Sequence, residues 1–261
     1  MSHAAHIRSS TGSATFAPGS SRPLERAASS GVALRLETPW GGRQASEAAF
    51  VAVVWPAPLE VVRRLVEVSE RQGASLGAFA VLVGGSAMAA HGIRAGSRDV
   101  DLYAPAVAEA AVAQVEAEYR ARYGPEFRLD VTTVENVWGL VMIRDIAEAP
   151  LVAEIETATG RRFAVRALAV EDLFVLKVAS GRRRDADDLP LLAPHTNADA
   201  IVARFNALVP GIGDRAALPG IADALVASLV SICGSSAARV IDGLALSEGL
   251  KDDLREAHHA A

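Results

Sequence analysis

Residues 81–103 read VLVGGSAMAAHGIRAGSRDVDLY, and this stretch decides the fold that we predict. A short apolar run ends at Gly84 and Gly85, where the missing side chains let backbone N–H groups approach an anion closely. Small residues then run from Ser86 to His91, and Gly92 follows them, which predicts a short helix that ends at this glycine. We therefore expect a phosphate to bind at the start of that helix.

The second half of the stretch places two aspartates on one face of a strand. Residues 99–102 alternate charged and apolar side chains, so the carboxylates of Asp99 and Asp101 point to the same face, ~7 Å apart. Two aligned carboxylates favour magnesium or manganese over zinc. Together with the glycine bend, they predict a site for a nucleoside triphosphate and a divalent metal ion.

A third acid follows in a second alternating segment. Residues 127–132 read FRLDVT, which predicts a half-buried strand with Asp130 on its polar face. If this strand lies beside residues 99–102, three carboxylates converge. Such a cluster can clamp two metal ions ~4 Å apart, one at the attacking oxygen and one at the leaving pyrophosphate.

Two blocks of the chain resemble a known superfamily. The run GGSAMAAHGIRAGSRDVDLY resembles the signature of the nucleotidyltransferases with a polymerase-beta-like core, in which Gly-Gly-Ser, a helix and Asp-x-Asp follow one another. Residues 170–188, VEDLFVLKVASGRRRDADD, resemble the lysine, arginine and aspartate block of AbiEii-type toxins and related small bacterial nucleotidyltransferases. The blocks occur in the expected order, and the similarity covers residues 78–192.

The resemblance implies an α/β (α+β) fold with a mixed sheet flanked by helices. It also implies transfer of a nucleoside monophosphate from ATP or another triphosphate to a hydroxyl group, with Mg²⁺ or Mn²⁺ as cofactor. The positions that match the triphosphate site are Gly84, Gly85, Ser86, Arg94, Ser97 and Lys177. The positions that match the metal and catalytic site are Asp99, Asp101 and Asp130, of which Asp130 would also deprotonate the acceptor. Asp185 and Asp188 match later acidic positions of the family.

Each motif also has an interpretation that needs no ligand. Gly-Gly-Ser alone is typical of a turn, and Asp-x-Asp alone is typical of a solvated edge strand. Lys177 lies among apolar residues, and its ammonium group could extend to the surface. Residues 182–184 are arginines that could end a helix, pair with the following aspartates or guide an RNA acceptor. We expect His91 to be a helix-end residue and Cys233 a buried structural thiol.

Composition limits the class of protein. The chain has 261 residues, 51% of them hydrophobic, a formal net charge of −5 and one cysteine. The negative charge argues against a generally basic nucleic-acid-binding protein, so an RNA partner would need a local basic patch. A single cysteine excludes an internal disulfide framework and suits a reducing compartment. We expect a cytoplasmic protein without a membrane span, because the most apolar segment, residues 221–234, is short and contains Asp223.

Three parts follow from the pattern along the chain. We expect a disordered leader over residues 1–30, a nucleotidyltransferase-like core over 31–192 and a helical C-terminal region over 193–261. A strand or two is expected over residues 31–54. Helices are expected over residues 58–73, 107–123, 169–180, 185–192, 199–208, 218–233 and 247–258. Strands are expected over residues 79–83, 99–102, 127–132, 151–156 and 163–167.

Three functions remain open from the sequence. The leading one is a metal-dependent nucleotidyltransferase whose acceptor is RNA, such as tRNA, or a protein hydroxyl, in a toxin–antitoxin or phage-defence pair with an antitoxin protein as partner. The second is a small-molecule nucleotidyltransferase of the aminoglycoside-modifying kind, in which acidic residues near the acceptor would attract a polycation. The third is a degenerate fold that binds a nucleotide or a protein partner without turnover.

Overall fold

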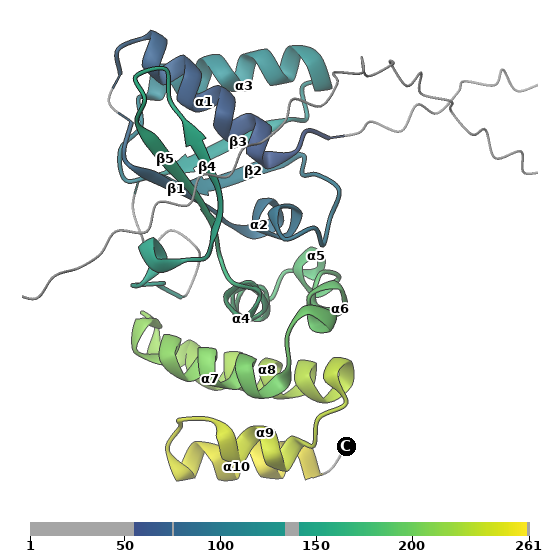
Figure 1. The fold of residues 1–261 in the computed structure, drawn as a ribbon. Helices are drawn as coiled ribbons and strands as arrows, with labels where there is room; N and C mark the ends of the chain where they lie inside the picture. Colours follow the sequence, from purple (N-terminus) through teal and green to yellow (C-terminus); the bar gives the residue numbers. More distant parts are fainter. Residues whose placement is uncertain (1–54, 75, 134–140, 260–261) are drawn as a thin grey trace, which may run out of the picture. The chain divides into compact units, whose positions relative to one another are not determined.

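The computed structural model describes residues 55–74, 76–133 and 141–259 (Figure 1). The chain divides into two units, Met1–Phe50 and Val51–Ala261, and all the described residues belong to the second. The leader expected over residues 1–30 and the strands expected over 31–54 lie outside the described residues.

A five-stranded mixed sheet forms the centre of the described unit, in the order β3-β2-β1-β5-β4. Its strands are β1 (Phe79–Leu82), β2 (Asp99–Tyr103), β3 (Arg128–Thr132), β4 (Leu151–Glu156) and β5 (Arg162–Ala167). Strand β1 runs antiparallel to β2 and parallel to β5, β2 runs parallel to β3, and β4 runs antiparallel to β5. The predicted fold class, a mixed sheet flanked by helices, is confirmed.

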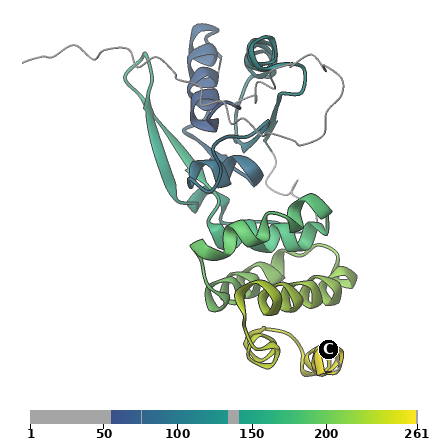
Figure 2. The same ribbon diagram turned by 90° about the vertical axis from the view of Figure 1, so that its right-hand side faces the viewer.

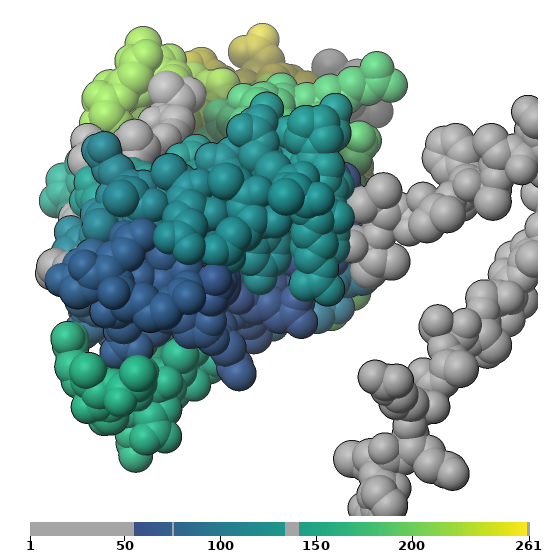
Figure 3. Space-filling model, turned by 90° about the horizontal axis from the view of Figure 1, so that it is seen from above, coloured from purple at the N-terminus to yellow at the C-terminus, as the bar shows by residue number. Residues whose placement is uncertain are grey.

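Helices α1 (Pro58–Arg71) and α3 (Glu109–Tyr123) lie side by side on one face of the sheet, and Figure 3 looks onto them. Proline occupies the first turn of α1, and its apolar residues recur at helical spacing, so they bury one stripe. A bidentate pair joins the two helices, in which Arg64 Nε and Nη2 donate to the carboxylate of Glu118 at 2.7 and 2.9 Å. Helix α3, which was expected over residues 107–123, connects β2 to the parallel strand β3.

The opposite side of the sheet carries α2 (Gly84–Ala90) and α4 (Val170–Ser180). The C-terminal helices continue from α4 in further layers (Figures 1 and 2). They are α5 (Arg183–Ala186), α6 (Leu189–Leu192), α7 (Ala198–Leu208), α8 (Leu218–Cys233), α9 (Ala237–Gly243) and α10 (Glu248–His259). Helix α4 packs against both α7 and α8, and one hydrophobic cluster extends from Val81 of β1 to Leu254 of α10.

The helices differ from the prediction at three places. The single helix expected over residues 185–192 is two short helices, α5 and α6, because Pro190 lacks an N–H group and its ring excludes the carbonyl of residue 186 from a continuous helix. Helix α9 was not predicted, since it has only seven residues and lies between turn-forming segments. Helix α2 begins at Gly84 rather than Ser86, so both glycines belong to its first turn.

Helix α8 bears on the expectation of no membrane span. Among the described residues, Arg215–Cys233 is long and apolar enough to cross a membrane, by length and composition alone. In the structure α8 packs on α4, α6 and α9, and Asp223 in its middle lies 3.0 Å from His258 of α10. The core helix of a soluble protein meets the same length and composition criterion, so the absence of a span stays a prediction.

Candidate functional site

The sheet brings the predicted acids together on neighbouring strands. Strands β2 and β3 pair with Asp101 directly opposite Asp130 and with Asp99 opposite Arg128. Val100, between Asp99 and Asp101, and its partner Leu129, next to Asp130, are buried, so the acids occupy the other face. The prediction that the strand of Asp130 lies beside the Asp-x-Asp strand is confirmed.

The diglycine bend lies directly against this acidic strand. Gly84 has a φ of +53°, which a side chain would strain. A Cβ atom at Gly84 would lie 3.3 Å from Oδ2 of Asp101, and one at Gly85 would lie 3.2 Å from Oγ of Ser97. The bend and Asp101 therefore approach as closely as they do because residues 84 and 85 have no side chains.

Two predicted serines hold the bend in place. Ser86 is fully buried; its hydroxyl donates to the carbonyl of Asp99 at 3.2 Å and accepts from the N–H of Asp101 at 3.1 Å. Ser97 donates to the carbonyl of Asp99 at 2.5 Å. The Ser86 hydroxyl, predicted to contact the triphosphate, is thus directed at the β2 backbone instead of the cavity. Its position fixes the start of α2 against the acidic strand.

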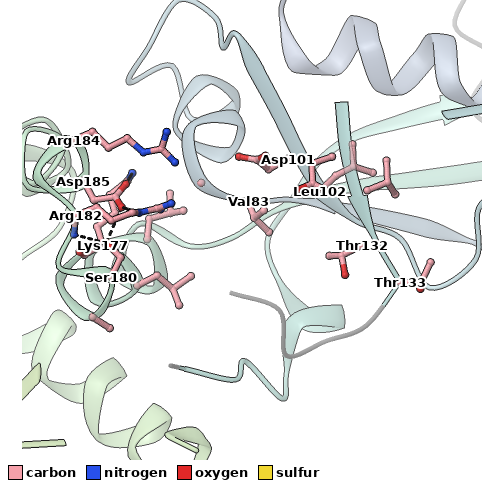
Figure 4. A pocket seen from close by; sticks show the side chains of 16 residues that line it. Val83, Asp101, Leu102, Thr132, Thr133, Lys177, Ser180, Arg182, Arg184 and Asp185 are labelled. Carbon is pink, nitrogen blue, oxygen red and sulfur yellow. Dashed lines mark hydrogen bonds and ion pairs between the residues drawn. The ribbon is translucent and has the colours of Figure 1, made fainter. Parts of the chain in front are cut away.

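A cavity of about 790 Å³ opens beside Asp101 and Asp130 (Figure 4). Its sheet side ends in Thr132 and Thr133, and its helical side is formed by α4 and the start of α5. The polar residues that line it are Asp101, Asp130, Thr132, Thr133, Lys177, Ser180, Arg182, Arg184 and Asp185. Of the predicted site residues, Gly84, Asp101, Asp130 and Lys177 line this cavity, whereas Gly85, Ser86, Arg94, Ser97 and Asp99 do not.

The helical wall of the cavity is basic but internally paired. Lys177 is buried, and its Nζ donates to Asp185 at 3.1 Å and to Asp188 at 2.5 Å. Burial lowers the pKa of Lys177, and the hydrogen bond to Asp185 opposes this shift. Burial also works to raise the pKa of Asp185, but hydrogen bonds from Ser180 and Lys177 outweigh it and the pKa is lowered. The interpretation that the Lys177 ammonium extends to the surface is wrong.

Arg94 connects the basic wall to the diglycine bend. Its Nη2 forms an ion pair with Asp188, which also accepts from Lys177. Its Nη1 is 3.5 Å from the place that a Cβ atom of Gly85 would occupy. Arg94 therefore lies next to the bend, as the resemblance implied, although it does not line the cavity.

The carboxylates of the sheet repel one another. Burial, together with the negative charges of Asp130 and Asp99, raises the pKa of Asp101 to about 6, while Arg184 and Arg182 act in the opposite direction. A cation that binds beside a carboxyl group with this shift stabilises its charged form. Strongly perturbed acids in a cavity are typical of functional sites.

Comparison with known proteins adds no relative. No family model, curated protein or solved structure matches this chain. The nucleotidyltransferase resemblance therefore rests on the sequence motifs alone.

The carboxylates at the cavity are suitable ligands for a divalent cation, but the described residues do not form a complete ligand set. Within residues 55–74, 76–133 and 141–259, no three His, Cys, Asp or Glu side chains are placed to hold one metal ion together. Oδ2 of Asp99 lies 3.4 Å from Nη2 of Arg98, and Asp99 does not line the cavity that Asp101 and Asp130 share. Among the described residues, the three carboxylates expected to converge therefore do not form a joint metal site. Asp101 and Asp130 supply hard oxygen ligands, to which phosphate oxygens or water would have to add.

Two residues for which the sequence predicted no role in the site do not line the cavity. His91 caps the end of α2, and its Nε2 is 2.8 Å from the carbonyl oxygen of Leu168. Cys233 is a half-buried free thiol at the end of α8, and burial raises its pKa, which disfavours a nucleophilic thiolate. The sequence analysis did not single out Thr132 and Thr133, although their position two and three residues after Asp130, at the end of β3, was the available signal.

Proposed function

We propose that this protein is a metal-dependent nucleotidyltransferase that moves a nucleoside monophosphate from a nucleoside triphosphate to a hydroxyl acceptor. The observation that carries the proposal is the meeting of Asp101, Asp130 and the Gly84 bend at one cavity that faces a basic helical wall. A carboxylate pair opposite guanidinium groups suits a ligand that brings both a cation and phosphates.

Different residues of the chain have different roles in the proposed reaction. The acceptor oxygen forms a bond to the α-phosphorus, the bond to the bridging oxygen breaks, and pyrophosphate leaves. Asp130, the more exposed acid, would take the acceptor proton, and Asp101 and Asp130 would hold the cation, which would supply charge neutralisation for the triphosphate. Gly84 and Gly85 would let the triphosphate approach the backbone. Arg94 links the diglycine bend to the helical wall through Asp188, and Lys177 pairs with the same carboxylate inside that wall.

The charge of the cavity bears on the acceptor. Three acids and three cations line it, but one acid, Asp185, is taken up by Lys177 and Arg182. This lining offers no acidic surplus to attract a polycation, so it does not favour the aminoglycoside-modifying alternative. An RNA or protein hydroxyl, in a pair with an antitoxin protein, stays the leading proposal.

The test is a transfer assay with the full chain. Each labelled triphosphate is incubated with Mg²⁺ or Mn²⁺ and either tRNA, total cell protein or an aminoglycoside. We expect label on one acceptor, and we expect Asp101→Asn to reduce transfer by at least ~10³-fold, because the substitution removes a carboxylate at the reacting phosphate. Asp187→Asn is the matched control, since Asp187 is an exposed acid outside the cavity. Equal transfer by wild-type and Asp101→Asn protein would remove Asp101 from the chemistry.

A further inference from the structure

The three consecutive arginines at the start of α5 have different surroundings. Arg182 lines the cavity, but its Nε donates to Asp185 at 2.5 Å. Arg183 is exposed and does not line the cavity. Arg184 lines the cavity, and Figure 4 shows its guanidinium group extending from α5 toward Asp101 on the opposite wall. The chain thus places one arginine of this triplet at the cavity without a tie to its own helix.

Arg184 acts on Asp101 through its charge, without a direct contact. No residue within 55–74, 76–133 and 141–259 forms a hydrogen bond or an ion pair with its side chain. The carboxylates nearest in sequence are already engaged: Asp185 accepts from Ser180, Lys177 and Arg182, and Asp188 accepts from Lys177 and Arg94. These two acids meet three cations before Arg184 is counted, so the helical wall has a surplus of positive charge.

We propose that Arg184 binds the phosphate groups of the nucleotide, as the free guanidinium of the wall that faces Asp101 and Asp130. A guanidinium group matches phosphate oxygens with two parallel hydrogen bonds, and the pairing strengthens inside a cavity. The ligand's phosphates neutralise Arg184, while the cation that accompanies them neutralises the acids of the sheet. This inference rests on the proposed function and names the residue that selects for a polyphosphate.

The position of Arg184 favours the nucleotide over an RNA backbone as the source of phosphate. Its side chain lines the cavity and points toward Asp101, whereas Arg183 does not line the cavity, although both residues are exposed. An extended polyanion would contact Arg183 at least as readily as Arg184, because backbone phosphates bind exposed cations without regard to the cavity. The pair Arg183 and Arg184 therefore separates the two sources by experiment.

The experiment measures binding without turnover. Dissociation constants of the full chain for inorganic tripolyphosphate with Mg²⁺, and for a single-stranded RNA oligonucleotide, are determined by calorimetry for wild type, Arg184→Ala, Arg184→Lys and Arg183→Ala. We expect Arg184→Ala to weaken tripolyphosphate binding about tenfold or more, as loss of a charge-assisted contact does. Arg184→Lys should recover part of the affinity, and Arg183→Ala should change it less than twofold.

Each result decides the proposal. Equal effects of Arg183→Ala and Arg184→Ala, no effect of either, or no tripolyphosphate binding by the wild type would each overturn it. Loss of RNA binding with intact tripolyphosphate binding would also overturn it and assign Arg184 to the acceptor. Circular dichroism and the melting temperature show whether each variant folds. If Arg184→Ala does not fold, the affinity of Arg184→Lys for tripolyphosphate serves as the test. A chain that binds tripolyphosphate through Arg184 but transfers no nucleotide would refute only the proposed function.

Discussion

At the scale of single residues, Asp101 has the most consequential environment. Its carboxyl group is partly buried, touches the space above Gly84 and lies beside two further acids. The pKa of about 6 means that its negative charge is unfavourable in the folded protein near neutral pH. In a cation-binding site, carboxylates repel one another before the cation binds, and this repulsion lowers the stability of the folded protein.

The pH dependence of this cost can be measured with Asp101→Asn. The folded pKa of about 6 lies above the value of 3.8 for a free side chain, so protonation favours the folded state, and this contribution is lost as the pH rises through 6. We therefore expect Asp101→Asn to be more stable than the wild type by ~1–2 kcal/mol at pH 7.5, and by almost nothing at pH 4. Urea unfolding in metal-free buffer between pH 4 and pH 8 measures the difference, and a less stable variant at pH 7.5 would contradict the assigned environment.

Residue roles could be predicted from the sequence where they depend on local geometry. The alternation in β2 and β3 was enough to place Asp101 on the same face as Asp99, and Asp130 on the polar face of its own strand, because the side-chain period of a strand is two. The partner of Ser86 could not be predicted, since its hydroxyl bonds a strand that begins 13 residues later. The partners of Lys177 could not be predicted from local geometry either, because the positions of Asp185 and Asp188 depend on the break between α5 and α6.

At the scale of elements, Arg204 of α7 connects three parts of the fold. Its Nε pairs with the buried Asp172 of α4, and its Nη1 and Nη2 both donate to the carboxylate of Asp145 at 2.8 Å. Burial raises the pKa of Asp172, and Arg204 works against this shift. The packing of α7 on α4 thus depends on one guanidinium group that stabilises a buried carboxylate.

Arg204→Met removes the charge but keeps an unbranched side chain. We expect the variant to lose about 3 kcal/mol of stability, because a buried carboxylate is left unpaired. Without Arg204 the pKa of Asp172 lies further above its unfolded value, so the loss should be larger at pH 8 than at pH 5. Chemical unfolding at the two pH values measures it. The control is Arg239→Met, whose partner Asp199 is 70% exposed and whose loss should cost less than ~0.5 kcal/mol. A loss that does not depend on pH would contradict this role of Asp172.

The elements themselves were predictable where a periodic pattern is long. Residues 218–233 and 151–156 were predicted with the bounds that α8 and β4 have, because apolar periodicity and flanking turn residues mark both ends. Helix α9 has seven residues and gains its stability from packing against α7, α8 and α10, so local propensity does not reveal it. Strand order was not predictable, since it depends on contacts between distant segments.

At the scale of the whole described unit, the sheet and the C-terminal helices share one hydrophobic cluster. Helix α4 is the link, because it contacts α2 on the sheet side and both α7 and α8 on the other. The candidate cavity lies at this link, between β2, β3, α4 and α5. The relative positions of its acidic and basic walls therefore depend on the integrity of the helices behind α4.

This dependence predicts that a defect in α8 destabilises the sheet as well. Leu225 is fully buried in α8, and Leu225→Ala should cost ~2–5 kcal/mol by loss of buried area and formation of a cavity. Trp55 packs on the cluster at the sheet end, and it becomes the single fluorophore when Trp40 and Trp138, which lie outside the described residues, are replaced by Phe. In that background we expect the urea midpoints from Trp55 fluorescence and from far-UV circular dichroism to fall together. Val230→Ala, at an exposed position of the same helix, should leave both midpoints almost unchanged. If the Trp55 midpoint does not change while the circular dichroism midpoint falls, the C-terminal helices unfold independently of the sheet. The two walls of the cavity would then lack a common core to fix their separation.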